Sequence, residues 1–184
     1  GEAAKFIGKN TPYYLRIFSF INKFKKSRFN FSAFILSGIY FLYRKMYGLG
    51  VLFSALVLGS MVGSAYISSL PAWKSIYTGI LQAQQSGQVL SFNNFFGLSP
   101  TEFLLFLSPL LANAVSLIVM VISGLIANKC YYNHSVKKIK KIKSTTNKEL
   151  LNEALETKGG VNLPIAISVA FAFLVVNYLP MFLM

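Results

Sequence analysis

The chain has 184 residues, of which 54% are hydrophobic and 12% charged, and its formal net charge is +13. Uncharged runs long enough to cross a bilayer recur along it, which excludes an ordinary water-soluble domain. The positive charge does not require a nucleic-acid partner, because Lys and Arg gather beside membrane spans on the cytoplasmic side. The single cysteine, Cys130, excludes an intramolecular disulfide and a thiolate metal cluster.

Residues 11–26 are predicted to form an amphipathic helix. Thr11 is the expected N-cap and Pro12 the first helical residue. Apolar residues from Tyr14 to Phe24 repeat at helical spacing on one face, and cations take the other. The pattern is typical of a helix on an anionic membrane surface. Packing of the apolar face on protein explains it equally well, and both can hold together.

The stretch 29–43 has no charge, is rich in aromatic residues and lies between Arg28 and Arg44. A helix of this length rises about 22 Å, which is short of a hydrocarbon core about 30 Å thick. Because basic residues stand at both ends, we predict a short aromatic helix that lies in the interface or re-enters on the same side.

This stretch also carries a family resemblance. The runs concerned are Phe29-Asn30-x-x-Ala33-Phe34 and Tyr43-Arg44-Lys45-Met46-Tyr47, with Phe6-Ile7-Gly8-Lys9-Asn10, Tyr13-Tyr14 and Lys158-Gly159-Gly160. They resemble an uncharacterised family of bacterial membrane proteins, domain of unknown function 2628, although Phe31 stands where that pattern has tryptophan. The resemblance implies a bacterial membrane location and no assigned activity. Family members often have a zinc-ribbon segment ahead of this region, and a start at Gly1 is consistent with a truncated or processed product.

Three uncharged stretches, residues 47–70, 103–127 and 161–184, are predicted to span the membrane. The run Ser99-Pro100-Thr101-Glu102 predicts the start of the second span through a capping box. The predicted helix-packing residues are small or polar: Ala55, Gly59, Gly63 and Asn113. The small residues indicate either a dimer seam or packing on another helix of the same chain, and we favour the second.

Two segments join these spans. Residues 71–99 are predicted to lie outside, with a second interfacial helix from Pro71 and an irregular aromatic run at 91–97. Residues 128–160 form a basic cytoplasmic segment, in which Thr146 and Glu149 predict a capping box for a short helix.

The charge distribution predicts the orientation. Placing residues 1–46 and 128–160 on one side puts every basic residue except Lys74 there. The N-terminus is therefore expected to be cytoplasmic and the C-terminus outside. We predict an all-α integral membrane protein with three transmembrane helices, an N-terminal amphipathic interfacial helix and a short re-entrant or interfacial aromatic helix. Residues 1–46 hold the interfacial helices, and residues 47–184 form the three-span domain.

The residues expected to face anionic lipid headgroups are basic residues of the predicted cytoplasmic side. They are Arg16, Lys23, Lys25, Lys26, Arg28, Arg44, Lys45, Lys137, Lys138, Lys140, Lys141 and Lys143. Each cation near an anionic leaflet contributes about 1 kcal/mol to binding.

No catalytic, metal-binding or cofactor-binding residues are predicted. The only histidine, His134, has no neighbouring carboxylate, and Cys130 is interpreted as a plain interfacial thiol rather than a reactive or lipidated one. The spans carry no ionisable residue, which disfavours ion-coupled transport.

These features predict a non-enzymatic, multi-pass protein of the bacterial cytoplasmic membrane, an anchor, accessory or regulatory subunit that grips the anionic leaflet. The alternative is a small homo-oligomeric pore, holin-like, or a transporter component. The expected partners are membrane lipids with anionic headgroups, together with a second copy of the chain or an unidentified membrane protein.

Overall fold

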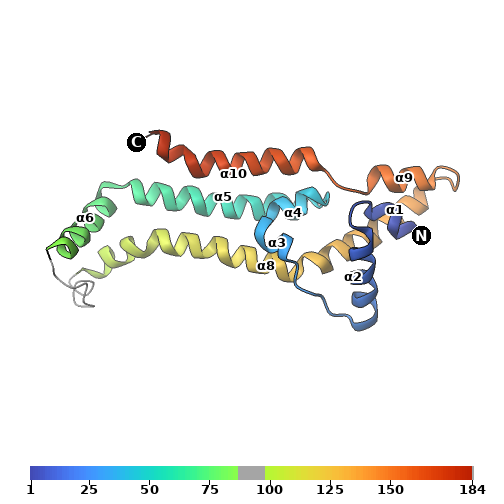
Figure 1. Ribbon diagram of the computed structural model, residues 1–184, viewed down its shortest axis with the longest axis horizontal. Helices are drawn as coiled ribbons and strands as arrows, with labels where there is room; N and C mark the ends of the chain where they lie inside the picture. Colours follow the sequence, from blue (N-terminus) through green and yellow to red (C-terminus); the bar gives the residue numbers. More distant parts are fainter. Residues whose placement is uncertain (87–97, 184) are drawn as a thin grey trace. The chain divides into compact units, whose positions relative to one another are not determined.

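The computed structural model of the chain describes residues 1–86 and 98–183, with side chains up to residue 178. Within these ranges every regular element is a helix, in the order α1 (Glu2–Ile7), α2 (Thr11–Phe24), α3 (Phe31–Leu36), α4 (Gly38–Tyr43), α5 (Tyr47–Ser69), α6 (Pro71–Gln85), α8 (Pro100–Thr145), α9 (Leu151–Lys158) and α10 (Leu163–Leu183) (Figure 1). The aromatic run expected at 91–97 lies outside the described residues.

Three helices are long and apolar enough to cross a membrane. They are α5, α8 and the stretch Leu151–Tyr178, in which α10 supplies the apolar part. The predicted fold class, all-α with three helices fit to span, is therefore confirmed. That the shorter helices lie at a membrane surface stays a prediction.

Contacts between residues divide the chain into two units. The first comprises Gly1–Ala55 and Ile118–Leu174, and the second comprises Leu56–Leu117 and Val175–Met184. Every basic residue except Lys74 and every acidic residue except Glu102 belongs to the first unit, which therefore carries the whole formal charge of +13. The predicted boundary at residue 46 separates interfacial helices from a three-span domain, which is a different kind of division. It stays a prediction.

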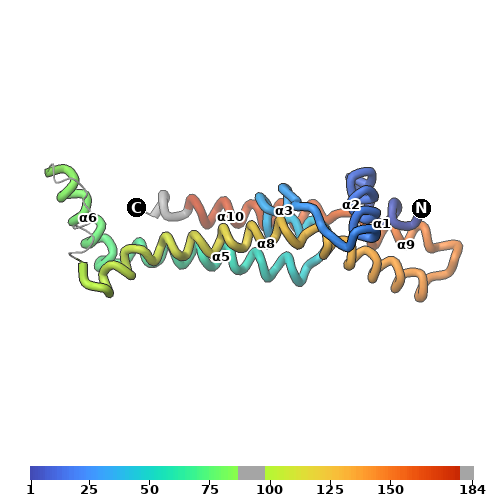
Figure 2. Tube along the Cα trace, turned by 90° about the horizontal axis from the view of Figure 1, so that it is seen from below, coloured from blue at the N-terminus to red at the C-terminus, as the bar shows by residue number. Residues whose placement is uncertain are grey.

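In the second unit, α5 and α8 run side by side (Figure 2), joined by polar contacts between small side chains. Ser60 Oγ contacts Ser116 Oγ, and Asn113 Nδ2 donates to Ser64 Oγ over 3.3 Å. Asn113, one of the predicted helix-packing residues, thus lies at the contact between the two helices.

The face of α5 that carries Ala55, Gly59 and Gly63 makes fewer contacts than the face that carries Ser60 and Ser64. No atom of another helix comes within 4 Å of a Cβ built at Gly59 or Gly63, and Ala55 is exposed. The predicted packing of these two glycines on another helix of the same chain therefore stays a prediction. Ser60 and Ser64 make the helix contact instead, because their hydroxyls find polar partners on α8. Contact of the glycine face with a second copy stays a prediction.

In the first unit, α2 packs its apolar face onto α8. Tyr14, Phe18 and Ile21 are buried. The Phe18 ring centroid lies 5.7 Å and 5.2 Å from the ring centroids of Tyr131 and Tyr132 on α8. Packing on protein therefore accounts for the apolar face of α2.

The short helix α1 lies against α9 (Figure 1), around a small core of Phe6, Ile142 and Leu155. The approach is close because Gly159 has no side chain: a Cβ there would overlap the carbonyl oxygen of Phe6. The backbone N–H of Gly160 donates to that same oxygen over 2.7 Å. The two glycines that follow α9 thus make room for α1.

The aromatic stretch forms two short helices, so the single helix predicted there is wrong. Ser37 separates α3 from α4 and has φ 44° and ψ −118°, a conformation that L residues rarely adopt. Its hydroxyl lies 3.0 Å from that of Ser123 on α8. The next residue, Gly38, is so close to α5 that a Cβ would overlap the backbone of Ser54. Contacts with α5 and α8 therefore hold the break in place.

The segment that contains α3 and α4, residues 29–43, is called the α3–α4 segment, and it doubles back along α8. At its start, Asn128 Nδ2 donates to the carbonyl of Arg28 over 3.0 Å, and at its end the Arg44 guanidinium lies 5.0 Å from the centroid of the Tyr131 ring. Between them, Ser37 reaches Ser123. Since a helix rises 1.5 Å per residue, the segment climbs roughly 10 Å along α8 and returns.

The capping box predicted at Ser99 is confirmed, and the N-cap predicted at Thr11 is wrong. Ser99 N–H donates to Glu102 Oε2 over 2.8 Å, and Glu102 N–H donates to Ser99 Oγ over 3.3 Å, which is the predicted capping box of α8. At α2 the N-cap is Asn10 rather than Thr11. The Thr11 hydroxyl instead donates to the carbonyl of Gly8, in the link that precedes the helix.

The basic segment after the second span is also more helical than predicted. α8 continues through the lysine run to Thr145, and α9 begins at Leu151 without the capping box expected from Thr146 and Glu149. The helix continues because Ile142 buries itself against α1 and α9. The isoleucine spacing within the lysines is thus an amphipathic pattern.

Candidate functional site

A buried polar cluster lies where α8 meets α2 and the α3–α4 segment, and Asn30 is its centre. The Asn30 side chain, 4% exposed, donates from Nδ2 to Asn128 Oδ1 over 2.8 Å and to Tyr40 Oη over 3.2 Å. Its Oδ1 accepts from the backbone N–H of Ala33 over 3.0 Å, which caps α3. Both polar atoms of this buried side chain therefore have protein partners.

The cluster continues to α2 through two tyrosines. Tyr14 Oη lies 3.0 Å from Tyr40 Oη. Burial, and next the neighbouring Tyr14, raise the pKa of Tyr40 well above its ordinary value. The Tyr40 phenol thus stays protonated at neutral pH and remains a hydrogen-bond donor. The network is uncharged and joins helices that are far apart in the sequence.

Arg44 lies beside this network with 2% of its surface exposed. Its Nη1 and Nη2 each donate to the carbonyl of Lys9 over 3.2 Å. The guanidinium also lies 4.3 Å from the Tyr14 ring centroid and 5.0 Å from that of Tyr131. Carbonyl dipoles and aromatic faces therefore stabilise this buried charge. The prediction that Arg44 faces anionic lipid is wrong, because the turn after α4 directs its side chain inward.

Lys45 is likewise occupied by protein contacts. It has φ 59°, and its Nζ donates to the carbonyl of Thr157 over 3.1 Å and to that of Gly159. These carbonyls lie at the end of α9, where a cation is stabilised by the helix dipole. Lys45 thus ties the turn after α4 to α9.

The remaining residues predicted to face anionic lipid are all exposed: Arg16, Lys23, Lys25, Lys26, Arg28, Lys137, Lys138, Lys140, Lys141 and Lys143. Among these exposed cations, Lys143 forms a salt bridge with Glu2 over 2.9 Å within the described residues. That these side chains face lipid stays a prediction.

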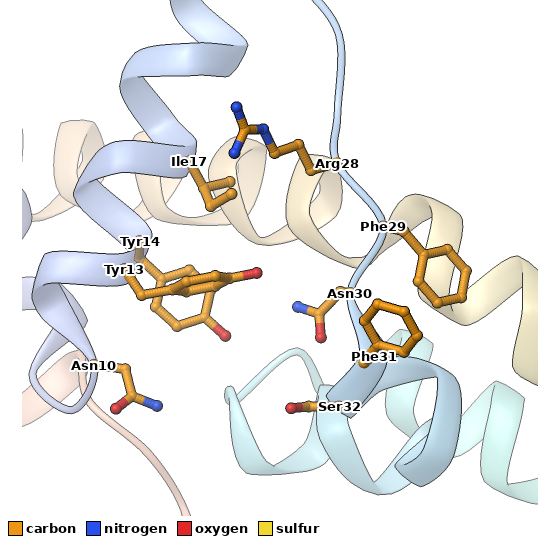
Figure 3. Close-up of a pocket in the computed structure, with 9 residues that line it drawn as sticks. All are labelled: Asn10, Tyr13, Tyr14, Ile17, Arg28, Phe29, Asn30, Phe31 and Ser32. Atoms are coloured by element: carbon orange, nitrogen blue, oxygen red, sulfur yellow. The ribbon is translucent and has the colours of Figure 1, made fainter.

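A pocket of about 430 Å³ opens beside the buried cluster (Figure 3). It is lined by Asn10, Tyr13, Tyr14, Ile17, Arg28, Phe29, Asn30, Phe31 and Ser32. Figure 3 shows the hydroxyls of Tyr13 and Tyr14 directed from α2 toward Asn30, with Arg28 extending from the loop toward Ile17. The lining supplies hydrogen-bond donors and one cation but no carboxylate, so it is suited to binding an anionic group.

Cys130 and His134 are both half-buried and line a second pocket, of about 370 Å³, with Lys45 and Lys138. In residues 1–86 and 98–183, no group of three or more His, Cys, Asp or Glu residues is placed to hold a metal ion.

Sequence reasoning missed Asn30, Tyr40 and Asn128 as the centre of the site. Part of the signal was present, because the spacing of Asn30 and Ala33 in the first motif is that of an N-cap and the residue it caps. Asn128 pairs with Asn30 across 98 positions, and no local pattern reveals such a pair.

Fold and site together define an all-helical protein with three helices fit to cross a membrane and a basic unit built around an uncharged polar cluster. The chain belongs to the family described as Protein of unknown function (DUF2628), whose model matches residues 7–137. The matched range contains Asn30, Arg44 and Asn128, and it confirms the resemblance to this family. The run Lys158-Gly159-Gly160 lies outside that range. A comparison with curated proteins and one with solved structures gave no match.

Proposed function

We propose that this chain is a non-enzymatic protein of the bacterial cytoplasmic membrane, which binds the anionic cytoplasmic leaflet and serves as an anchor, accessory or regulatory subunit. The proposal rests on one observation: the net positive charge of the chain is confined to one of its two structural units. The first unit is defined by contacts between residues, without regard to charge. It comprises Gly1–Ala55 and Ile118–Leu174, and it holds the whole net charge of the chain.

The exposed surface of this unit supports the same function. Beside the exposed cations, α3 presents apolar side chains to the outside, with Phe31 73% and Ile35 66% exposed. Exposed aromatic and aliphatic groups next to cations favour a membrane interface, where apolar groups enter the headgroup boundary and cations meet anionic lipid. The excess of Lys and Arg supports a cytoplasmic position for this unit.

The test measures the lipids that the full-length protein retains on purification from a bacterial membrane. Replacing Lys137, Lys138, Lys140 and Lys141 by Gln should lower the anionic lipid retained, because about 1 kcal/mol of attraction is lost with each cation. Rising ionic strength should weaken the preference of the wild type in the same way. The variant should remain in the membrane after an alkaline wash, since the apolar spans are unchanged.

A matched control replaces four other exposed lysines, Lys5, Lys9, Lys148 and Lys158, and should reduce anionic lipid less. Equal retention of anionic and neutral lipid by the wild type at low salt would contradict the proposal. The basic residues would then record only the orientation of insertion. Partners that co-purify with the chain, identified by mass spectrometry, would test the anchor or regulatory role.

A further inference from the structure

We propose that the pocket between α2 and the start of α3 binds the phosphate headgroup of one anionic glycerophospholipid. The acyl part of the lipid would lie beside Phe31. The proposal rests on the membrane location proposed above, and it adds a saturable site of defined residues to the diffuse charge of the surface.

The chemistry of the pocket favours an oxyanion. Four of its lining side chains offer hydrogen-bond donors: Asn10, Tyr13, Arg28 and Ser32. None of these side chains makes a hydrogen bond to another side chain within the described residues, and no acidic residue lines the pocket. A volume of about 430 Å³ is within the usual range of small-molecule sites. Free donors without a competing carboxylate bind a phosphate well.

Arg28 is the cation of this pocket, and it is positioned before any ligand arrives. Its guanidinium lies 4.6 Å from the centroid of the Phe20 ring, and its own carbonyl accepts a hydrogen bond from Asn128. The backbone and the head of the side chain are therefore both held. A guanidinium held in this way loses little conformational entropy when it binds a phosphate.

The rim of the pocket indicates an amphiphile rather than a soluble phosphate ester. Phe31 is 73% exposed and Phe29 is 36% exposed, and both line the pocket. Ile35, one turn beyond Phe31 on α3, extends this apolar surface away from the donors. A polar, cationic pocket that opens onto exposed apolar side chains matches a ligand with a charged head and an acyl tail.

The floor of the pocket connects it with the buried cluster. Tyr14 and Asn30 line the pocket and also belong to the network that reaches Tyr40 and Asn128. Because Tyr14 and Asn30 already have protein partners, we place the phosphate at the four donors Asn10, Tyr13, Arg28 and Ser32. The floor then determines how deep the headgroup enters.

The test is a titration of the full-length protein in detergent with phosphatidylglycerol, followed by native mass spectrometry. Phosphatidylcholine with the same acyl chains is the neutral comparison. One phosphatidylglycerol should bind per chain, and Arg28→Gln should weaken it about tenfold or more, because a charged hydrogen bond is lost. The control Lys148→Gln removes an exposed cation that neither lines the pocket nor belongs to the residues predicted to face headgroups, and it should leave binding unchanged. Tyr13→Phe deletes a single hydroxyl and should weaken binding about fivefold.

Two results would overturn the proposal. If Arg28→Gln and Tyr13→Phe bind phosphatidylglycerol as Lys148→Gln does, the pocket is not the site. If glycerol 3-phosphate displaces the lipid at equal concentration, the pocket binds a soluble phosphate ester and not a lipid. Failure here is distinguishable from failure of the proposed function. The lysine replacements would still lower bulk anionic lipid if only the pocket were wrong, and they would have no effect if the leaflet binding itself were wrong.

Discussion

The guanidinium of Arg44 lies 4.3 Å from the centroid of the Tyr14 ring, which places a cation from the turn after α4 against an aromatic face of α2. Its hydrogen bonds go to the carbonyl of Lys9, in the link between α1 and α2. One side chain thus joins α4 to the first two helices of the chain, and a desolvated cation over a ring is stabilised by about 2 kcal/mol.

Replacing Arg44 by Lys should destabilise the protein by about 2 kcal/mol, although the charge is kept. A lysine ammonium cannot donate as a planar fork to the Lys9 carbonyl or stack on Tyr14. Thermal unfolding in detergent, followed through the reactivity of the single thiol Cys130, measures the loss as a lower midpoint. Arg16→Lys is the control, because Arg16 is exposed and, among the described residues, its side chain donates to the carbonyl of Pro12 in its own helix. Equal midpoints for the two variants would mean that Arg44 contributes only its charge.

The pair Asn30 and Asn128 should behave as a coupled unit. Asn128→Ala should cost about 1–3 kcal/mol, because Asn30 Nδ2 is left with Tyr40 Oη alone as its acceptor and the Arg28 carbonyl loses the Asn128 donor. Once Asn30 is also Ala, the second substitution should cost less than it does alone, with a coupling of about 1 kcal/mol. Asn133→Ala, at an exposed position of the same helix, is the control. Strictly additive losses would contradict the coupling.

Two nearby glycines of α5 should respond oppositely to alanine. A Cβ at Gly50 would lie 2.5 Å from Leu42 Cγ and 2.8 Å from the Leu42 backbone nitrogen, so Gly50→Ala should separate α4 from α5 and cost about 1–3 kcal/mol. Nothing lies within 4 Å of a Cβ at Gly48. Gly48→Ala should therefore leave stability unchanged or raise it by up to about 1 kcal/mol through helix propensity. The same thiol-reactivity assay compares them, and similar losses at both positions would disprove the close contact.

Accessibility to a membrane-impermeant maleimide tests the orientation. Cys130 should react in opened cells and not in intact ones, because it lies in the basic unit expected to be cytoplasmic. In a Cys130→Ser background, single cysteines at the exposed positions Arg28 and Gly48 should report that same side, since the α3–α4 segment between them doubles back. Labelling of only one of the two positions in intact cells would show that the segment crosses the membrane, and labelling of both would invert the orientation.

Periodicity and charge predicted the helices well, but they could not predict which surface each face contacts. The apolar face of α2 is visible in the sequence, but the rings that it contacts, Tyr131 and Tyr132, lie more than a hundred residues away. Arg44 shows why local patterns fail at the site. In sequence it is one more cation at the end of an apolar stretch, and only the tertiary fold supplies the rings and carbonyls that make its burial tolerable. The capping box at Ser99 was predictable because all its partners are local.

The contacts of the α3–α4 segment also bear on the order in which the chain is assembled. The partners of Asn30 and Ser37 on α8 are separated from them by 98 and 86 positions. The segment therefore leaves the ribosome long before α8 exists. An unpaired polar group costs several kcal/mol in hydrocarbon, so the segment has to wait in a hydrated place until α8 has been synthesised. We expect its docking to be a late step of biogenesis, and truncated nascent chains that end before residue 123 to leave it open to protease.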